Sequence, residues 1–369
     1  MAKKTNIYDD VFKDADALNP DATILSDNAL SVVDAWVDTG SYALNAIVSG
    51  SCFKGIQQGR IIGLSGPSGC GKTLIMTKIL GNFQKEDPTR WGIVFDSEVA
   101  LDAATARSLG ANPDQIKHYP VNTVNSARNQ ILAVLNKILE KNLQKKFMII
   151  IDSLGNLASG KEIKDAEEDK SAADMGLRAK EIKSMLRTLT YRAAKAKTTI
   201  LFSNHEYDDP AAMYPSAIKN QSGGKAPIYL SSLIIQLGFK REKNEKEFES
   251  EEILSAAKKV GGITMHALTA KNRFLPPMLA TDIYLNFKTG VDKYSGLFEL
   301  AHGLGVITGD RTYECNGNTL GYRKAFEKDA NVWDNIIIPK LEEVLKKEFV
   351  FSSSVEEIKK EVDNIKEEK

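Results

Sequence analysis

Short apolar runs alternate with amphipathic stretches from about residue 36 to residue 290. We interpret the apolar runs as strands at residues 61–65, 92–96, 147–152, 199–203, 232–237 and 263–268. Between them, apolar residues recur with helical spacing at 74–83, 127–141 and 174–196. Strands buried on both faces of a parallel sheet form continuous apolar runs of this kind. The pattern therefore predicts an α/β fold, with a mostly parallel twisted sheet and helices on both of its faces.

Smaller regions are expected on either side of this core at 36–290. Residues 1–35 are weakly periodic, with Pro20 as a break, and predict an N-terminal arm or small helical piece. The composition changes after residue 290, so residues 291–369 are expected to form a small C-terminal domain with a helix at 335–349. Its last part, 355–369, is expected to be a short amphipathic helix or a charged tail. The highly charged segment 241–252, within the core, is interpreted as a solvated hairpin or insertion.

Composition and charge narrow the class of protein. The 369 residues include 49 Lys and Arg against 49 Asp and Glu, and this zero net charge argues against a uniformly basic nucleic-acid-binding protein. The three cysteines, Cys52, Cys70 and Cys315, are far apart, which excludes a disulfide framework and fits a reducing cytoplasm. No run of about 18 apolar residues and no signal peptide are present, so no membrane partner is expected.

One segment carries a complete nucleotide-binding motif. Residues 66–73 match G-x-x-x-x-G-K-[ST], between an apolar strand and a helix. Glycines let successive backbone N–H groups face phosphates, and the helix N-terminus adds a positive dipole end. We expect Lys72 to reach the β- and γ-phosphates of ATP and the Thr73 hydroxyl to bind Mg²⁺. The cofactor-binding residues predicted here are Gly66, Pro67, Ser68, Gly69, Cys70, Gly71, Lys72 and Thr73.

Acidic residues follow two neighbouring strands. Asp152 ends the apolar run at 147–151 and is positioned to hold Mg²⁺ through its water shell. Hydrolysis also needs a group that orients or deprotonates the attacking water. Glu98 and Asp96 both fit this role at the end of another strand, and their spacing leaves the choice open. The sequence thus predicts a P-loop ATPase.

A basic stretch suggests what the hydrolysis drives. Over residues 178–197 a single anion, Glu181, accompanies the cations Arg178, Lys180, Lys183, Arg187, Arg192, Lys195 and Lys197. On a helix, Lys180, Lys183 and Arg187 share one face, which is typical of a polyanion track but also of a solvated helix face.

Two loops are predicted beside this helix, at 160–170 and 207–226, with an order that depends on the nucleotide. His205 lies just before the second loop. It is positioned either to contact the γ-phosphate or to fill a core or capping role.

Together these features resemble the RecA-family homologous recombinases, most closely the phage UvsX-type branch, over about residues 30–350. The resemblance rests on an ordered set of motifs. They are FDSE at 95–98, ALD at 100–102, DSLGNLAS at 152–159, MGL at 175–177, NH at 204–205, GG at 223–224, KNR at 271–273 and YSG at 294–296.

The resemblance assigns roles to individual residues. It implies that Glu98 is the catalytic glutamate, that His205 senses the γ-phosphate, and that Lys271 and Arg273 reach the ATP of a neighbouring subunit. Asp102 would contact the adenine edge, although Thr105 replaces the family's usual adenine-stacking tyrosine. The residues implied to contact single-stranded DNA are Met175, Gly176, Lys180, Lys183, Arg187, Gly223 and Gly224.

The resemblance also implies an activity. It is that of a DNA-dependent ATPase that uses ATP and Mg²⁺, forms a helical filament on single-stranded DNA and exchanges strands with homologous double-stranded DNA. Residues 1–35 would make a subunit contact in the filament. A loading protein and a single-strand DNA-binding protein are possible partners, and the expected location is the cytoplasm of a phage-infected bacterium.

Two other functions remain open. The first is a hexameric DNA helicase of the same fold, against which the 271–273 motif argues. The second is a recombination mediator that uses nucleotide only as a structural ligand. Intact Glu98 and Asp152 argue against this mediator.

Overall fold

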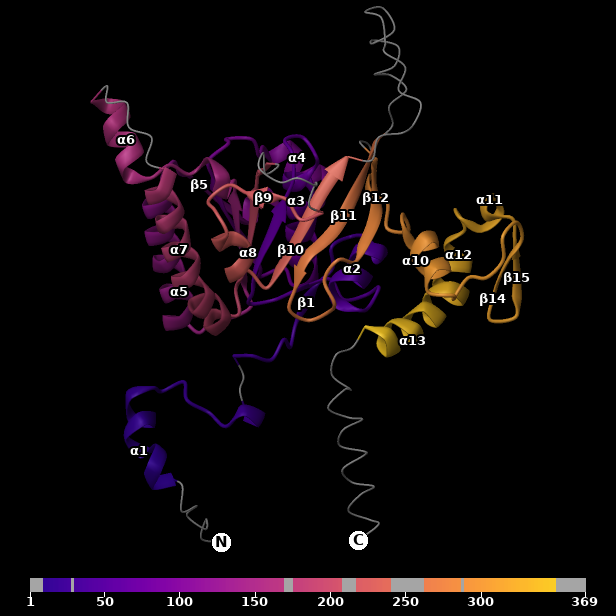
Figure 1. Ribbon diagram of the computed structural model, residues 1–369, viewed down its shortest axis with the longest axis horizontal. Coiled ribbons are helices and arrows are strands. Elements are labelled where there is room, and N and C mark those ends of the chain that lie inside the picture. The colour runs from indigo at the N-terminus through magenta and orange to yellow at the C-terminus, as the bar shows by residue number, and fades with distance from the viewer. Residues whose placement is uncertain are drawn as a thin grey trace, which may run out of the picture. The chain divides into compact units, whose positions relative to one another are not determined.

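The structure is a computed structural model that describes residues 9–27, 30–168, 175–207, 217–239, 262–286 and 289–349 (Figure 1). The chain divides into two units, Met1–Asp34 and Ala35–Lys369. The described part of the first unit contains helix α1 (Asp9–Leu18) and a 3-10 turn, η1 (Leu25–Asp27). The predicted charged segments 241–252 and 355–369 lie outside the described residues.

A large sheet forms the centre of the second unit. Within the described residues its nine strands run in the order β13-β12-β11-β10-β3-β7-β6-β4-β5. The strands from β10 to β5 are parallel, whereas β11, β12 and β13 extend the sheet in antiparallel fashion. The six predicted strands are β3 (Ile61–Ser65), β4 (Trp91–Asp96), β6 (Phe147–Asp152), β7 (Thr199–Asn204), β10 (Leu233–Phe239) and β11 (Gly262–Asn272).

Three strands of this sheet were not predicted: β5 (Ile116–Pro120), β12 (Ala280–Asn286) and β13 (Gly290–Val291). The edge strand β5 is largely exposed, and β12 alternates buried with half-buried positions. Neither therefore has the continuous apolar run of a strand buried on both faces. The predicted α/β class, with a mostly parallel sheet, is confirmed.

Helices cover both faces of the sheet (Figure 1). Strand β6 shows this most simply, because Met148 and Ile150 join one apolar cluster and Ile149 and Ile151 join the other. The first cluster includes α2 (Tyr42–Ser49) and α3 (Lys72–Glu86). The second includes α5 (Val124–Glu140) and α7 (Met175–Ala196), which lie side by side. Burial of apolar side chains on both faces is the main source of stability for such a sheet.

The C-terminal part of the second unit has its own apolar cluster, built around the buried Trp333. Ala43, Ala46 and Cys52 from the α2 region join this cluster. The predicted helix at 335–349 is present as a π-helix followed by α13, and the predicted boundary after residue 290 stays a prediction. The elements are α10 (Leu297–Gly303), β14 (Tyr313–Cys315), β15 (Asn318–Gly321), α11 (Arg323–Phe326), α12 (Ala330–Val332), η4 (Trp333–Ile337) and α13 (Ile338–Glu348).

The expectation of a loop at 160–170 is wrong for its larger part. Residues Gly160–Glu167 form helix α6. Ser159 accepts a hydrogen bond from the backbone N–H of Glu162, whose carboxylate accepts one from the Ser159 N–H. This capping box satisfies two N–H groups that would otherwise lack partners, and it starts the helix.

The second predicted loop is framed by short elements. Strands β8 (Glu206–Tyr207) and β9 (Asn220–Gln221) pair in antiparallel fashion, and α8 (Ala226–Leu230) follows a turn. Residues 208–216, between the two strands, lie outside the described part of the chain.

The remaining short elements are β1 (Trp36–Val37), β2 (Ile56–Gln57), α4 (Ala103–Ser108), η2 (Pro113–Gln115) and η3 (Leu154–Asn156). Among the described helices, none has both the length and the apolar character needed to cross a membrane.

Candidate functional site

The parallel strands bring the predicted nucleotide residues to one edge of the sheet. Ser65 at the end of β3 pairs with Asn204 of β7, and Asp96 of β4 pairs with Asp152 of β6. Polar side chains that follow these strand ends therefore converge at the carboxyl edge. Open α/β sheets bind ligands at this edge.

The P-loop occupies this edge between β3 and α3. Gly71 has a φ of +90°, and a Cβ built on it would lie 2.6 Å from the sulfur of Met265. Gly66 has a φ of +155°, and its Cβ would lie 2.3 Å from the carbonyl oxygen of Leu237. Larger residues would be strained and would have no room at either position. Residues 67–69 are exposed, so the crest of the loop is open to solvent.

Lys72 is held over the loop. Its Nζ donates to the carbonyl oxygens of Gly66 and Pro67 at 3.0 and 2.8 Å. The neighbouring Cys70 is fully buried, and this burial raises the pKa of its thiol. Because the thiolate is the reactive form, Cys70 serves as a small packing residue of the loop.

Thr73 and Asp152, which were each predicted to hold Mg²⁺, lie in contact. The Thr73 hydroxyl donates to Oδ2 of Asp152 at 2.6 Å, and the Ser203 hydroxyl donates to its other oxygen. Burial raises the pKa of Asp152, while these hydroxyl donors oppose the shift. Hydroxyl and carboxylate oxygens are ligands that suit Mg²⁺.

No group of three or more His, Cys, Asp or Glu in the described residues could hold a metal by itself. A site with one carboxylate and one hydroxyl fits a Mg²⁺ ion that keeps several waters and binds phosphate oxygens, as in ATPases. The residues present therefore fit Mg²⁺ bound together with a nucleotide.

Asp96 and Glu98 have different surroundings. Asp96 is buried, and its Oδ1 accepts the backbone N–H groups of Glu98 and Val99 at 2.9 and 2.6 Å. Its Oδ2 lies 3.0 Å from Nε2 of His118. Asp96 thus holds the turn that follows β4. The Glu98 side chain is partly exposed, and its Oε1 accepts a 3.3 Å hydrogen bond from Asn156.

His205 links this edge to the second predicted loop. Its Nε2 lies 3.3 Å from Oε1 of Glu98. Its backbone N–H donates to Oδ1 of Asn204 at 3.0 Å, and its carbonyl oxygen accepts the N–H of Ser222 at 3.1 Å. The strand end at His205 and the segment before Gly223 are therefore hydrogen-bonded directly.

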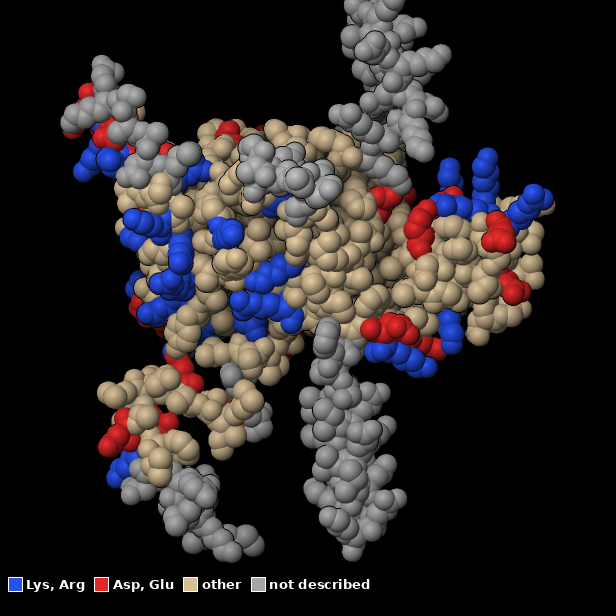
Figure 2. Space-filling model, viewed as in Figure 1, with Lys and Arg blue, Asp and Glu red and all other residues tan. Residues whose placement is uncertain are grey.

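The predicted cationic face of α7 is exposed. Lys180, Lys183 and Arg187 are exposed, and Ile182 and Met185 on the other face are buried. Figure 2 shows Lys and Arg side chains gathered along the α7 side of the core. Gly176 is exposed in the first turn of α7. This helix begins at Met175, a residue whose side chain lies outside the described part.

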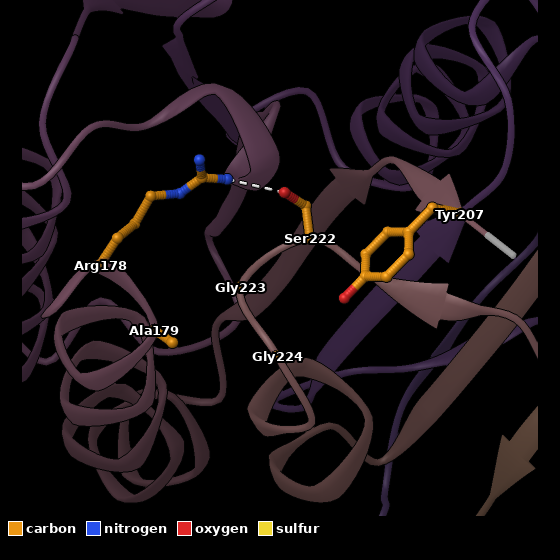
Figure 3. Close-up of a pocket in the computed structure, with 6 residues that line it drawn as sticks. All are labelled: Arg178, Ala179, Tyr207, Ser222, Gly223 and Gly224. Carbon is orange, nitrogen blue, oxygen red and sulfur yellow. Dashed lines mark hydrogen bonds between the residues drawn. The ribbon is translucent and has the colours of Figure 1, made fainter. Parts of the chain in front are cut away.

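The two predicted DNA-binding segments lie against each other. A Cβ on Gly223 would lie 2.7 Å from Cδ1 of Ile182 in α7, so this close approach needs glycine. Where they meet there is a hollow of about 410 Å³ (Figure 3). Its lining residues are Arg178, Ala179, Tyr207, Ser222, Gly223 and Gly224.

Lys271 and Arg273 are not brought to this site. They lie at the C-terminal end of β11 (Gly262–Asn272). The Lys271 Nζ donates to the carbonyl oxygens of Ile228 and Tyr229 at 2.7 Å each. Arg273 donates to the Tyr229 oxygen at 3.4 Å. Burial lowers the pKa of Lys271 to about 8, with a smaller effect from the charge of Arg273.

Asp102 has a local role in the structure. Its Oδ1 accepts hydrogen bonds from the N–H groups of Ala104 and Thr105, and its Oδ2 accepts one from the Thr105 hydroxyl. Asp102 thereby caps the N-terminus of α4. These hydrogen bonds, chiefly those from Thr105, lower the pKa of Asp102. The adenine contact assigned to it stays a prediction.

Two residues at the carboxyl edge of the sheet, the nucleotide edge, were not predicted from the sequence. Ser203, which donates to Asp152, is the buried last residue of the predicted strand at 199–203. It belongs to no recognised motif, so its sequence context did not mark it as a site residue. Asn156, which donates to Glu98, lies inside the DSLGNLAS run, so its position in that motif could have identified it.

Fold and site together define an α/β P-loop protein whose nucleotide edge is hydrogen-bonded to a segment beside a basic helix. The family model of the RecA N-terminal domain matches residues 21–292, and the chain belongs to the RecA family.

Three relatives illustrate the similarity. A recombination and repair protein of enterobacteria phage T4 is 29% identical over 264 residues, which cover 72% of this chain and 62% of the T4 protein. The RecA protein of Leptospira biflexa is 28% identical over 305 residues, 80% of this chain and 72% of the relative. The RecA protein of Bifidobacterium breve is 26% identical over 331 residues, 89% of this chain and 77% of the relative. The T4 match thus spans less than two thirds of that protein.

Proposed function

We propose that this protein is an ATP-dependent recombinase. It would form a helical filament on single-stranded DNA and exchange strands with a homologous duplex, in recombination, repair and recombination-dependent replication. Members of the RecA family are DNA-dependent ATPases, which supports the enzyme class. The observation that carries the proposal is the hydrogen bond between His205 and Ser222, because it joins the nucleotide edge to the predicted DNA-binding segment.

The P-loop edge would bind and hydrolyse ATP. Lys72 and the backbone N–H groups of residues 66–73 would hold the phosphates, and Thr73 and Asp152 would hold Mg²⁺. Bound there, Mg²⁺ supplies positive charge to the phosphate oxygens. Glu98 would accept a proton from the attacking water while the bond between the γ-phosphorus and the bridging oxygen breaks.

Lys271 and Arg273 would act on a neighbouring subunit. They are held together by the carbonyl oxygens at the end of α8, away from their own P-loop. Lys271 pairs with Ile234 near the start of β10, at the edge of the sheet opposite to the P-loop, and this position supports an action between subunits. Cations supplied by a neighbour would stabilise transition-state charge only in an assembled filament.

A second subunit contact would use the N-terminal arm. Val11, Phe12 and Leu18 of α1 are exposed in a segment rich in aspartate. A largely apolar groove of about 510 Å³, lined on α5 and the β4–β5 edge, has a basic rim and offers a complementary surface on another copy. Its apolar lining includes Trp91, Tyr119, Val134, Leu143 and Phe147, and its rim is Lys117, Lys137 and Lys141.

DNA would be held by the cationic face of α7 and the segment at Gly223 and Gly224. Contacts to the phosphate backbone leave the base edges free for pairing, so little sequence preference is expected. The loading protein, the single-strand DNA-binding protein and the infected bacterial cell stay predictions from the family resemblance.

The proposal is tested by ATP hydrolysis with and without single-stranded DNA, together with electron microscopy of the same samples. A recombinase should show DNA-stimulated turnover and extended filaments. Closed hexameric rings that unwind a forked duplex would instead establish the helicase. Nucleotide binding without DNA-stimulated turnover would favour the mediator.

A further inference from the structure

Arg178 directs its guanidinium into the protein rather than along the cationic face of α7. One nitrogen, Nη2, donates to the Ser222 hydroxyl at 2.7 Å (Figure 3). The same nitrogen donates to the carbonyl oxygen of Gly155. Its buried Nε has no acceptor among the described residues. This differs from Lys180, two residues further on, which is exposed.

Both acceptors belong to segments that contact the nucleotide edge. Gly155 lies in η3, directly after the strand that carries Asp152, and the next residue, Asn156, donates to Glu98 at 3.3 Å. Ser222 donates its N–H to the His205 carbonyl, and its own carbonyl accepts Nδ2 of Asn204 at 2.9 Å.

These contacts form a closed ring. It runs from Glu98 through Asn156 and Gly155 to Arg178, then through Ser222 and His205 back to Glu98. The ring is also tightly packed, because a Cβ on Gly155 would lie 2.9 Å from Oδ1 of Asn204 and 3.3 Å from a Ser222 carbon. Arg178 is the member of this ring that comes from α7.

We infer that Arg178 is a positioning residue that couples the nucleotide edge to the DNA-binding segments and is not itself a phosphate ligand. This inference rests on the proposed function. Nη2 makes both bonds with two N–H groups whose directions are fixed by the guanidinium plane, whereas a lysine ammonium lies on a shorter side chain and its N–H groups rotate freely. A shift of His205 or Glu98 would therefore move Ser222, the adjacent Gly223 and the first turn of α7 together.

The test compares Arg178→Lys with Lys180→Ala, a matched change on the same helix. The affinity for single-stranded DNA is measured over a range of salt concentrations, and its dependence on salt concentration gives the salt slope. The rate of ATP hydrolysis at saturating DNA, divided by the same variant's rate without DNA, gives the DNA stimulation. Arg178→Lys should keep the wild-type salt slope and lose about tenfold of the DNA stimulation. Lys180→Ala should lower the salt slope by about 0.7, the loss of one phosphate contact on a single strand, and raise the DNA concentration that full stimulation requires.

A lower salt slope with intact stimulation in Arg178→Lys would make Arg178 a phosphate ligand and overturn the inference. Ser222→Ala gives a second route that does not alter charge. Its loss of stimulation should not add to that of Arg178→Ala, because both changes break the same contact. Fully additive losses would overturn the coupling role. Wild-type protein without any DNA stimulation would instead refute the proposed function, so the two failures are distinguishable.

Discussion

Nε2 of His205 lies 3.3 Å from Oε1 of Glu98, although the two residues follow different strands. Glu98 follows β4 and His205 follows β7, with β6 between them in the sheet. The predicted general base and the predicted phosphate sensor thus touch across the strand that carries Asp152. If loss of the γ-phosphate moved either His205 or Glu98, the contact between them would pass that movement to the other residue.

Glu98→Gln should retain ATP and DNA binding and lose turnover. The amide keeps the size of the side chain but cannot accept a proton, so steady-state phosphate release should fall by about 10²–10⁴-fold. Glu343→Gln, a carboxylate of α13 paired with Lys340, is the control and should hydrolyse ATP normally. Wild-type turnover in Glu98→Gln would remove the residue from the catalytic role.

Asp96→Asn should act through stability as well as rate. The buried carboxylate accepts the N–H groups of Glu98 and Val99 and contacts His118. An amide replaces one acceptor oxygen with a donor, which should lower the free energy of unfolding by about 1–3 kcal/mol. Denaturant unfolding measures this loss. If Asp96→Asn were as stable as the wild type but catalytically dead, Asp96 would be the stronger candidate for the base.

Lys271 should act on the ATP of another subunit. Lys271→Ala, which keeps an intact P-loop, can be mixed with Lys72→Ala, which should not bind nucleotide stably. Hydrolysis by the Lys271→Ala subunits should be rescued when Lys72→Ala neighbours supply the lysine. No rescue at any mixing ratio, in filaments seen by microscopy, would argue against an action between subunits.

The pKa of Lys271 gives this contribution a pH dependence. Burial lowers the pKa from 10.5 to about 8, so the folded protein loses this proton at a lower pH than an unfolded chain. The ammonium is present below about pH 8, and DNA-stimulated turnover should fall as the pH rises through that value. Lys271→Arg stays charged and should flatten the decline. A decline of equal size in both proteins would place its cause elsewhere.

Gly223→Ala should disturb the junction of the two DNA-binding segments. Gly223 and Gly224 have φ values of +86° and +77°, so alanine is strained at both. Only at Gly223 would the new Cβ collide with Ile182, at 2.7 Å; at Gly224 the nearest atom is a methyl carbon 3.7 Å away. Gly223→Ala should therefore cost about 1–3 kcal/mol more in unfolding free energy than Gly224→Ala. Equal losses would show that backbone strain alone matters.

Much of the core was predictable because its strands are buried on both faces. The runs that became β3, β4, β6 and β7 are apolar except at their ends, and the P-loop motif fixes its own context between strand and helix. Strand β5 exposes Lys117 and His118, so its sequence resembles a loop. Helix α6 was missed because its charge suggested a loop, although Ser159 and Glu162 are spaced as a capping box.

The direction of a side chain could not be predicted from charge counts. Arg178 belongs to the same cationic run as Lys180, yet it turns inward because Gly155 and Ser222 offer acceptors from segments far away in the sequence. The contact between His205 and Glu98 has the same origin, because it depends on strand order. Such relationships arise from tertiary packing and have no local sequence signal.

Strand exchange tests the central claim most directly. A single-stranded circle is incubated with the protein, ATP, Mg²⁺ and a homologous linear duplex, with a heterologous duplex as the control. A recombinase should give joint molecules with the homologous duplex alone. Hydrolysis stimulated by single-stranded DNA, with no joint molecules from either duplex, would contradict the proposed strand exchange.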